Sequence, residues 1–180
     1  MLAAPEPGGK VGVEKHITTM ALPIGSKAPA ITLKSKDASG LADVSLTRSI
    51  GKKQTVLLFV PLAFTGVCTE ELCSISNSIQ AYNSLNADVI AVSVDSPFAQ
   101  EVWAKNSGLQ FTLASDFNRE AATAYGVRED NFLPGVLGYK GIAKRSAFVF
   151  GIDGIIKFSW SSDDSSKLPP FDAINKALKS

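Results

Sequence analysis

The chain has 180 residues, of which 45% are hydrophobic and 19% charged, and its formal net charge is +1. This length and composition are those of one globular domain with a substantial core. A charge so near zero argues against a basic nucleic-acid binder or a protein of anionic membrane surfaces. One histidine and two cysteines are too few for a structural zinc site or a disulfide-dense scaffold. No apolar run reaches the roughly 18 residues of a membrane span.

The N-terminal segment, residues 1–21, contains proline, glycine and mixed charges rather than a patterned element. A secretory signal needs an apolar stretch of about 7–15 residues after a basic start, and Pro5 interrupts the short apolar run here. We therefore expect an extension over residues 1–21, a single domain over residues 22–180, and a cytoplasmic protein. His16 has no second ligand nearby, so we expect it to be solvated and without a role.

Two continuous apolar runs predict buried strands of a parallel sheet. One covers residues 55–60, between Gly51 and Pro61, and the other covers residues 89–94. Such runs are typical of strands that are covered on both faces. A helical stretch over residues 65–85 joins them, which makes a crossover unit of strand, helix and strand that is right-handed in nearly all proteins.

The rest of the chain continues the alternation of helices and strands. Ser96 and Pro97 begin a helix that ends at Gly108, and Asp116 caps another that ends at Gly126. The sum is an α/β domain, a central mixed β-sheet flanked by helices on both faces. The other predicted elements are a strand over residues 111–113, a hairpin of residues 146–150 and 155–160, and a helix over residues 170–178.

Residues 61–73 follow a buried strand and open the long helix, a place where α/β proteins form their sites. Cys68 falls in the first turn of that helix. The unpaired N–H groups and the positive end of the helix dipole favour an anion there. For a cysteine this anion is the thiolate, which is the nucleophilic form.

The helical period separates the two cysteines. At about 100° per residue, Cys68 falls in the middle of the apolar face with Leu72 and Ile75, whereas Cys73 falls on the polar face. Cys68 is therefore a nucleophile or a structural core cysteine, and Cys73 is its partner or a tolerated surface cysteine. The spacing is not that of the C-x-x-C redox motif, and with so few other ligands we expect no metal.

The segment around Cys68 resembles the peroxiredoxin family. The family motif P-x-x-x-T-x-x-C occurs as Pro61, Thr65 and Cys68, and Glu71 matches an acidic residue often found three positions later. Further similarity lies in Trp103, in residues 115–127, and in residues 144–150, which resemble the strand that carries the family's catalytic arginine, here Arg145.

The subtype is mixed. The sequence Pro-Leu-Ala-Phe-Thr-Gly-x-Cys is similar to the alkyl hydroperoxide reductase E type. The five-residue separation of Cys68 and Cys73 is instead that of the Q type, or bacterioferritin-comigratory protein. The resemblance covers about residues 22–178 and implies a thioredoxin-like fold, which agrees with the predicted order of elements.

The resemblance also implies an activity. It implies a thiol-dependent peroxidase without cofactor or metal, a homodimer that reduces hydrogen peroxide and organic hydroperoxides through a cysteine sulfenic acid. Its partner would be a thiol reductant such as thioredoxin, a glutaredoxin-like protein or a low-molecular-weight thiol. Cys73 would be a possible resolving cysteine, which closes a disulfide with Cys68.

Individual roles follow from the same resemblance. Cys68 would be the nucleophile, and Pro61 would shield its thiolate from water and over-oxidation. Thr65 would offer its hydroxyl to the peroxide or the thiolate. Arg145, which keeps its charge, would stabilise the thiolate and the developing negative oxygen. Glu71 and Trp103 would support the site.

Each role has a structural alternative. Thr65 could be only a helix cap, Arg145 a surface residue of a strand, Glu71 a first-turn helix charge, and Trp103 a core aromatic residue. Two other functions also stay open for the chain: a thioredoxin-like disulfide oxidoreductase that uses the Cys68–Cys73 pair, and a chaperone or binding module without peroxide turnover.

Overall fold

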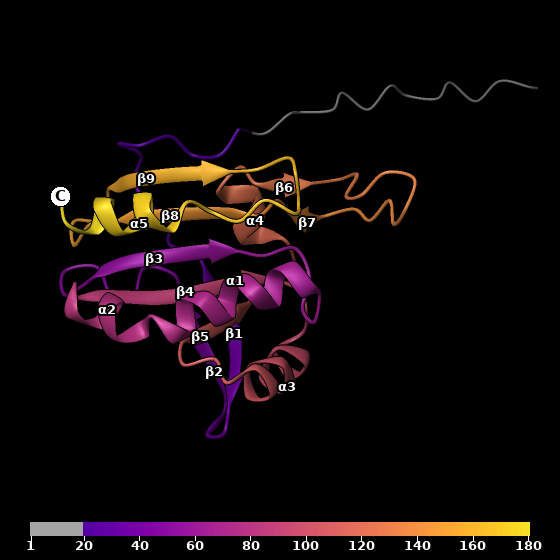
Figure 1. Ribbon diagram of the computed structural model, residues 1–180, viewed down its shortest axis with the longest axis horizontal. Coiled ribbons are helices and arrows are strands. Elements are labelled where there is room, and N and C mark those ends of the chain that lie inside the picture. The colour runs from indigo at the N-terminus through magenta and orange to yellow at the C-terminus, as the bar shows by residue number, and fades with distance from the viewer. Residues whose placement is uncertain (1–19) are drawn as a thin grey trace, which may run out of the picture.

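The first apolar run forms β3, Gln54–Phe59, an inner strand of a mixed sheet in the computed structural model, which describes residues 20–180 (Figure 1). β3 pairs in parallel with β4, Ala87–Ser93, and β4 pairs in parallel with β5, Thr112–Ser115. The other edge of β3 pairs antiparallel with β8, Ser146–Phe150, which continues into β9, Ile156–Ser161. The predicted mixed sheet and C-terminal hairpin are thereby confirmed.

Two further pairs of strands have no counterpart among the predicted elements. β1, Thr32–Asp37, and β2, Gly40–Ser45, form a hairpin that joins the sheet beside β5, so the strand order is β2-β1-β5-β4-β3-β8-β9. β6, Arg128–Glu129, and β7, Ile142–Ala143, form a separate two-stranded sheet at the base of a projecting arm, residues 130–141 (Figure 1). Their polar or very short sequences carry little apolar periodicity.

The helices cover both faces of the large sheet. On one face lie α1, Gly66–Asn77, α2, Ile79–Ser84, α3, Pro97–Ser107, and α5, Phe171–Leu178. On the other face lies α4, Glu120–Ala124. This three-layer arrangement is the thioredoxin-like architecture that the sequence predicts.

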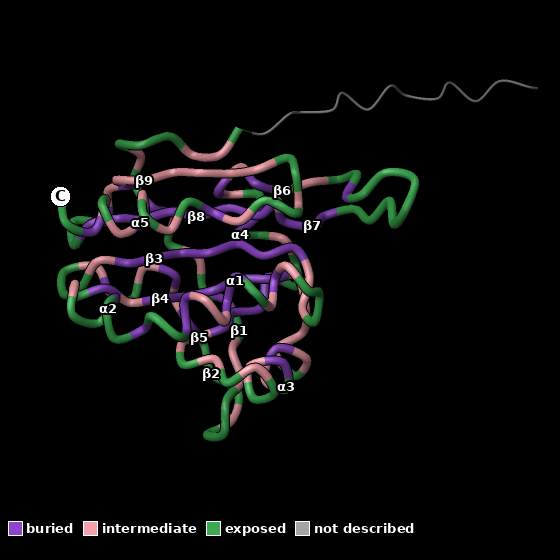
Figure 2. Tube along the Cα trace, in the orientation of Figure 1, coloured by how far each residue is buried: buried purple, intermediate pink, exposed green. Residues whose placement is uncertain are grey.

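The alternation of side chains along β3 explains why its whole run is apolar. Val56 and Leu58 pack under the helices of the first face, whereas Leu57 and Phe59 pack with Tyr125 after α4 on the second face. Both sets are fully buried, as Figure 2 shows for this strand. A strand of a sheet that is covered on both faces therefore needs apolar residues at every position.

Helix boundaries follow the local signals where these are strong. The hydroxyl of Ser96 accepts a hydrogen bond from the Ala99 N–H at the start of α3, and Gly108 ends that helix in the left-handed conformation, φ 62°. The predicted continuous helix over residues 65–85 is wrong, because Ser78 interrupts it. This break falls in the sequence Ser76-Asn77-Ser78, whose short polar side chains compete with helical backbone bonds.

The helix expected to begin at Asp116 is shorter than predicted. α4 starts only at Glu120, after Arg119 in a left-handed conformation. The Asp116 carboxylate nevertheless binds its N-terminus, and accepts hydrogen bonds from the amides of Ala121 at 2.9 Å and Ala122 at 2.8 Å. Asp116 therefore caps α4 through its side chain, although it lies four residues before the first residue of the helix.

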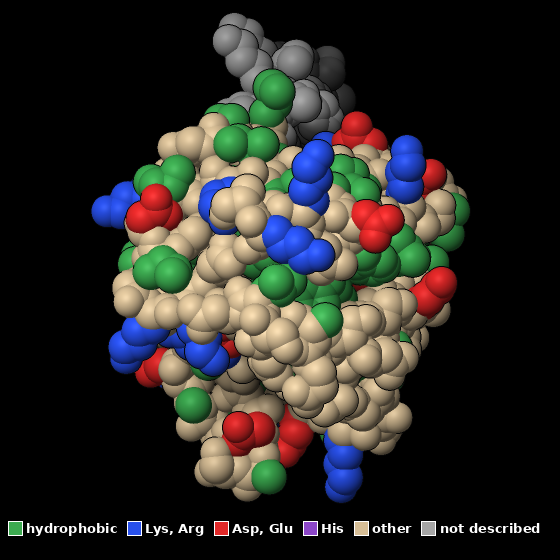
Figure 3. Space-filling model, turned by 60° about the vertical axis from the view of Figure 1, so that its left-hand side comes forward, with side chains coloured by type: hydrophobic (Ala, Val, Ile, Leu, Met, Phe, Trp, Pro, Cys, Tyr) green, Lys and Arg blue, Asp and Glu red, His purple; other side chains and the backbone are tan. Residues whose placement is uncertain are grey.

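Most of the extension expected over residues 1–21, including His16, lies outside the described residues. The described chain enters along Tyr125, whose carbonyl accepts a hydrogen bond from the Leu22 N–H. None of the helices in the described part is long and apolar enough to cross a membrane. On the face that Figure 3 shows, Lys and Arg side chains are interspersed with Asp and Glu, and neither sign forms a continuous patch there.

The Asp116 contacts give a first prediction. Asp116→Ala leaves two buried helix amides without their acceptor, so we expect the free energy of unfolding to fall by about 1–2 kcal/mol in urea titrations. Asp172→Ala is the control, because Asp172 is an exposed first-turn carboxylate of α5, and it should cost no more than about 0.5 kcal/mol. Equal losses in the two variants would contradict this capping role.

Candidate active site

Cys68 lies where the sequence places it, in the first turn of α1. The chain leaves β3, passes the buried Pro61 and enters α1 at Gly66, so Cys68 is the third residue of the helix. Its side chain is only 1% exposed and packs in the apolar core with Leu72. The thiol therefore combines burial with the positive end of a helix.

Arg145 reaches the same point from another strand. β8 runs antiparallel to β3 with Ser146 opposite Phe59, so the residue before β8 lies at the carboxyl end of β3. Arg145 is 2% exposed, and its Nη2 donates a hydrogen bond to the Cys68 Sγ at 3.4 Å. The alternative that Arg145 is a surface residue is thus wrong, because the register of the sheet turns it inwards.

Glu71 is the anionic partner of Arg145. Its carboxylate is fully buried and forms an ion pair and hydrogen bond with Arg145 Nη1. The alternative of a first-turn helix charge is wrong, since α1 begins at Gly66 and Glu71 lies in its second turn, facing inwards. Burial raises the pKa of Glu71 to about 7, although the charge and hydrogen bond of Arg145 pull it down.

The guanidinium is held from a third side by a main-chain atom. The carbonyl of Ser165 accepts hydrogen bonds from Arg145 Nε at 3.1 Å and from Nη2 at 2.8 Å. Burial lowers the pKa of Arg145, but Glu71 and Cys68 raise it by more, so the guanidinium stays charged. Ser165 is a site residue that the sequence does not indicate, because any residue type can offer a carbonyl.

Thr65 stands at the mouth of the site. It has the extended backbone of an N-cap residue, but its side chain makes no capping bond and donates instead to the carbonyl of Leu62 at 2.9 Å. The alternative that the Thr65 side chain serves only as a helix cap is therefore wrong. The residue is exposed, and a hydroxyl that donates one hydrogen bond can still accept another.

Trp103 is a core aromatic residue, as its structural alternative holds, and it also contacts the helix that carries Cys68. Its ring is 1% exposed, and its Nε1–H donates to the Thr69 hydroxyl at 3.1 Å. That hydroxyl donates in turn to the carbonyl of Thr65 at 2.8 Å. A chain of hydrogen bonds thus joins α3 to the first turn of α1.

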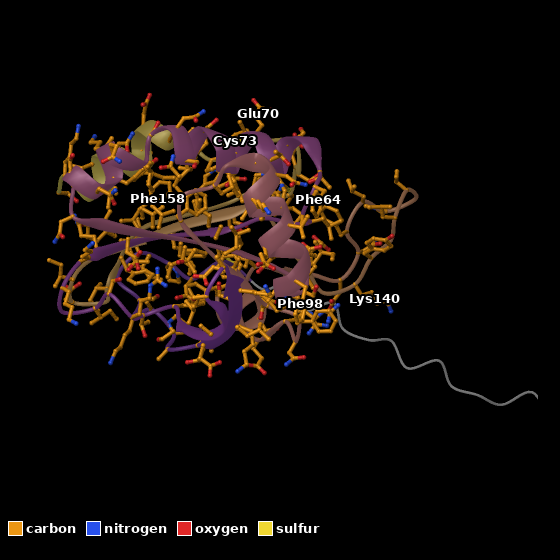
Figure 4. All side chains as sticks on the ribbon, turned by 90° about the horizontal axis from the view of Figure 1, so that it is seen from below. Phe64, Glu70, Cys73, Phe98, Lys140 and Phe158 are labelled. Atoms are coloured by element: carbon orange, nitrogen blue, oxygen red, sulfur yellow. The ribbon has the colours of Figure 1, made fainter. Side chains whose placement is uncertain are left out.

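Cys73 lies away from this cluster. It is a free thiol on the same continuous helix, half-buried, and its Sγ is 3.7 Å from the carbonyl of Ser107 at the end of α3. The prediction of a polar helix face holds for the residue types, but α3 partly covers this face. Ser76 binds the backbone there, with its hydroxyl 3.2 Å from the Gly108 carbonyl. Figure 4 shows Cys73 and Glu70 on α1.

The arrangement is suited to nucleophilic chemistry at sulfur. A buried thiol and a permanently charged guanidinium lie within hydrogen-bonding distance near a helix N-terminus, and the exposed Thr65 is the N-cap residue of the same helix. Such a cation stabilises a thiolate, and it also stabilises negative charge on an oxygen that develops beside it.

Known proteins share this sequence and fold. Residues 24–159 match the AhpC/TSA family. Alkyl hydroperoxide reductase E of Mycobacterium tuberculosis (strain ATCC 25618 / H37Rv) is 35% identical over 140 residues, which cover 77% of this chain and 84% of that protein. A protein of Clostridium pasteurianum named "Putative peroxiredoxin in rubredoxin operon" is 32% identical over 145 residues, 76% of each chain.

Solved structures agree. AhpC of Mycobacterium tuberculosis superposes with a TM-score of 0.74 at 26% identity, over 89% of this chain and 93% of that one. The reduced 2-Cys peroxiredoxin of Plasmodium vivax gives a TM-score of 0.75 at 24% identity, over 87% and 80%, and supports the fold. This chain therefore belongs to the AhpC/TSA family and is a peroxiredoxin, a thiol-dependent peroxidase.

Proposed function

We propose that Cys68 is the nucleophile that reduces hydrogen peroxide and organic hydroperoxides. The observation that carries this proposal is the buried Cys68 thiol 3.4 Å from Arg145 Nη2 at a helix N-terminus. The thiolate attacks one peroxide oxygen, so an S–O bond forms as the O–O bond breaks. The other oxygen leaves with the electron pair, takes up a proton and departs as water or an alcohol, and Cys68 becomes a sulfenic acid.

The neighbouring residues act on this step in different ways. Arg145 stabilises first the thiolate and then the departing oxygen, since the same guanidinium faces both. Thr65 offers its hydroxyl to the bound peroxide, and Pro61 limits the access of water to the sulfur. Glu71 acts through Arg145, because its carboxylate fixes the guanidinium.

The substrate range and surroundings are part of the proposal. A cavity of about 320 Å³ beside Arg145 is lined by Phe132, Leu133 and Pro134 of the arm and by polar residues that include Lys144 and Asp163. It would hold the organic part of a small hydroperoxide. Both cysteines are free thiols, which fits a cytoplasmic location. Residues 22–180 would act as one thioredoxin-like domain.

We also propose that the protein is a homodimer. Large apolar side chains are exposed near the site and on the arm, and such patches mark interfaces. Figure 4 shows Phe64, Phe98 and Lys140 at the end of the molecule from which the arm projects. The exposed set comprises Phe64, Phe98, Val102, Phe117, Val136, Leu137 and Tyr139.

Cys73 is proposed as the resolving cysteine. Its thiol would attack the Cys68 sulfenic acid, which forms the S–S bond and releases water. An external thiol, such as thioredoxin, a glutaredoxin-like protein or a low-molecular-weight thiol, would then reduce the disulfide. Residues five apart on a helix have Cα atoms roughly 8.7 Å apart, and a disulfide rarely spans more than about 7 Å. The first turns of α1 must therefore unwind in each cycle.

This distance also bears on the alternative functions. A disulfide oxidoreductase keeps its two sulfurs within bonding distance in a C-x-x-C turn, which this helix does not provide. A chaperone or binding module has no need of an arginine buried against a thiol. Peroxide consumption by the reduced protein separates a peroxidase from both alternatives, and insulin reduction separates the disulfide oxidoreductase from the chaperone or binding module.

The nucleophile has a direct test. Cys68→Ser should abolish peroxide consumption, because a serine hydroxyl is not ionised near neutral pH and does not attack peroxide. The circular dichroism spectrum should stay unchanged, because serine is nearly isosteric with cysteine. Cys73→Ser is the matched control and should still consume one equivalent of peroxide per chain. Turnover above the free-thiol background in a folded Cys68→Ser protein would refute the assignment.

The Glu71–Arg145 pair predicts a pH dependence of stability. Folding raises the Glu71 pKa from 4.5 to about 7, so the native protein holds a proton that the unfolded chain releases. The stabilising contribution of Glu71 to the free energy of unfolding is therefore fully present below pH 4.5. It is lost as the pH rises towards 7, and the total loss is on the order of 3 kcal/mol. Urea unfolding at several pH values measures it. Glu71→Gln should lack this slope, and parallel curves for the two proteins would contradict the prediction.

The redox cycle predicts a change in α1. After one equivalent of peroxide, amide hydrogen exchange should lose protection from about residue 65 to Cys73, while the Ser76 end keeps the bonds that tie it to Gly108. Intact mass should show an internal disulfide, and Cys73→Ser should instead keep a sulfenic acid. Unchanged protection together with a free Cys73 thiol would make this a one-cysteine enzyme.

A further inference from the structure

The loop that leads into the site contains an unfavourable backbone conformation. Phe64 has φ 62°, the left-handed region, which a bulky residue rarely adopts. It lies between Ala63 and Thr65, directly before the N-cap residue of the helix that carries Cys68. Such a conformation persists only where contacts on both sides hold it, so the contacts of this turn determine where Thr65 lies.

One of these contacts is a carboxylate from the next strand. Asp95 follows β4, and its Oδ2 accepts a hydrogen bond from the Ala63 N–H at 2.8 Å. Ala63 is the residue directly before Phe64. A hydrogen bond to a carboxylate is stronger than one between neutral groups, so Asp95 ties the loop firmly to the carboxyl end of β4.

Asp95 is itself fixed by a buried polar network. The Ser93 hydroxyl donates to the same Oδ2 at 2.8 Å, and the Asp95 carbonyl accepts from the Ser115 hydroxyl at 2.6 Å. Gln100 of α3 donates to Ser93 Oγ at 2.9 Å and to the Ala114 carbonyl at 3.1 Å. The carboxylate is therefore oriented by Ser93 of β4, which Gln100 of α3 binds in turn, while the Asp95 main chain is tied to β5 through Ser115.

The other side of the turn is held by α3. The ring of Phe64 lies 6.1 Å from that of Trp103, centroid to centroid, and Trp103 reaches the Thr65 carbonyl through Thr69. Phe64 is otherwise 55% exposed, so its ring contributes little burial of its own. The strained turn is thus held between Asp95 on the Ala63 side and Trp103 on the Thr65 side.

We propose that Asp95 is a positioning residue for the reaction at Cys68. It touches no reacting atom. Its carboxylate holds Ala63, and through the Phe64 turn it sets the place of the Thr65 hydroxyl relative to the sulfur and to Arg145. This inference rests on the proposed function, in which peroxide binds between Thr65 and Arg145.

The proposal distinguishes two reactions of the same sulfur. Attack on peroxide needs the oxygen atoms aligned by Thr65 and Arg145, and a displacement of about 1 Å costs on the order of 100-fold in rate. Alkylation by iodoacetamide needs the thiolate but not that alignment. Loss of Asp95 should therefore slow the first reaction and leave the second unchanged, whereas unfolding would alter both.

The experiment measures both rates for Cys68 in a Cys73→Ser background. Asp95→Ala should slow the reaction with hydrogen peroxide by about 10- to 100-fold, with the iodoacetamide rate within about twofold. Asp95→Asn should restore most of the peroxide rate, since its amide oxygen can accept the Ala63 N–H. Asp88→Ala is the control, because Asp88 binds Arg48 and Ser49 at the amino end of the same strand, and both rates should stay unchanged.

A wild-type peroxide rate in folded Asp95→Ala would overturn the proposal, and so would a parallel fall of both rates. If Asp95→Ala does not fold, Ser93→Ala removes one hydrogen bond that orients the carboxylate. Ser93→Ala should slow only the peroxide reaction. A peroxide rate equal to that of the background protein would again overturn the proposal. Failure of the proposed function looks different, since Cys68 would then not react with peroxide even in the background protein with Asp95 intact.

Discussion

The structure of the site depends on one buried cation. Arg145 is taken out of water, and a buried charge is tolerated only when it is paired and hydrogen-bonded. Glu71 supplies the opposite charge, the Ser165 carbonyl takes two of the N–H groups, and Cys68 lies within reach of what remains. The sulfur thus completes the set of partners of Arg145. The contacts that compensate for the burial of the arginine also place it against the thiol.

The topology makes this meeting possible. β3 and β8 are antiparallel neighbours, so the end of one and the beginning of the other lie at the same edge of the sheet. α1 starts from the first of these points, and its first two turns present Cys68 and Glu71 inwards together. Strand direction therefore brings the distant Arg145 to Cys68 and Glu71, and the helical period turns those two neighbours to the same side.

Much of this follows from the sequence, and the exceptions have identifiable causes. Ser96 and Gly108 fix α3 because their effects are local. The sequence leaves Glu71 open between a supporting residue of the site and a solvated helix charge, because its pairing with Arg145 on a distant strand is a tertiary contact. Ser165 could not be found, since its contribution is a carbonyl. The covering of Cys73 by the end of α3 is likewise tertiary, and helical angles alone do not show it.

The charges of the site give Glu71 a second effect besides orienting Arg145. Its pKa of about 7 means that both the ionised and the neutral carboxyl occur near neutral pH. With the Cys68 thiolate and an ionised Glu71, two anions share one guanidinium. In the proposed reaction the negative charge moves from sulfur to the departing oxygen, which leaves after taking up a proton, so the pair Glu71–Arg145 remains behind and is neutral. Peroxide attack therefore relieves the surplus of negative charge in a buried place, where an uncompensated charge is most costly. In the proposed mechanism Glu71 thus has two opposing effects: it orients the arginine that faces the departing oxygen, and in its ionised form it adds a second negative charge beside the same guanidinium.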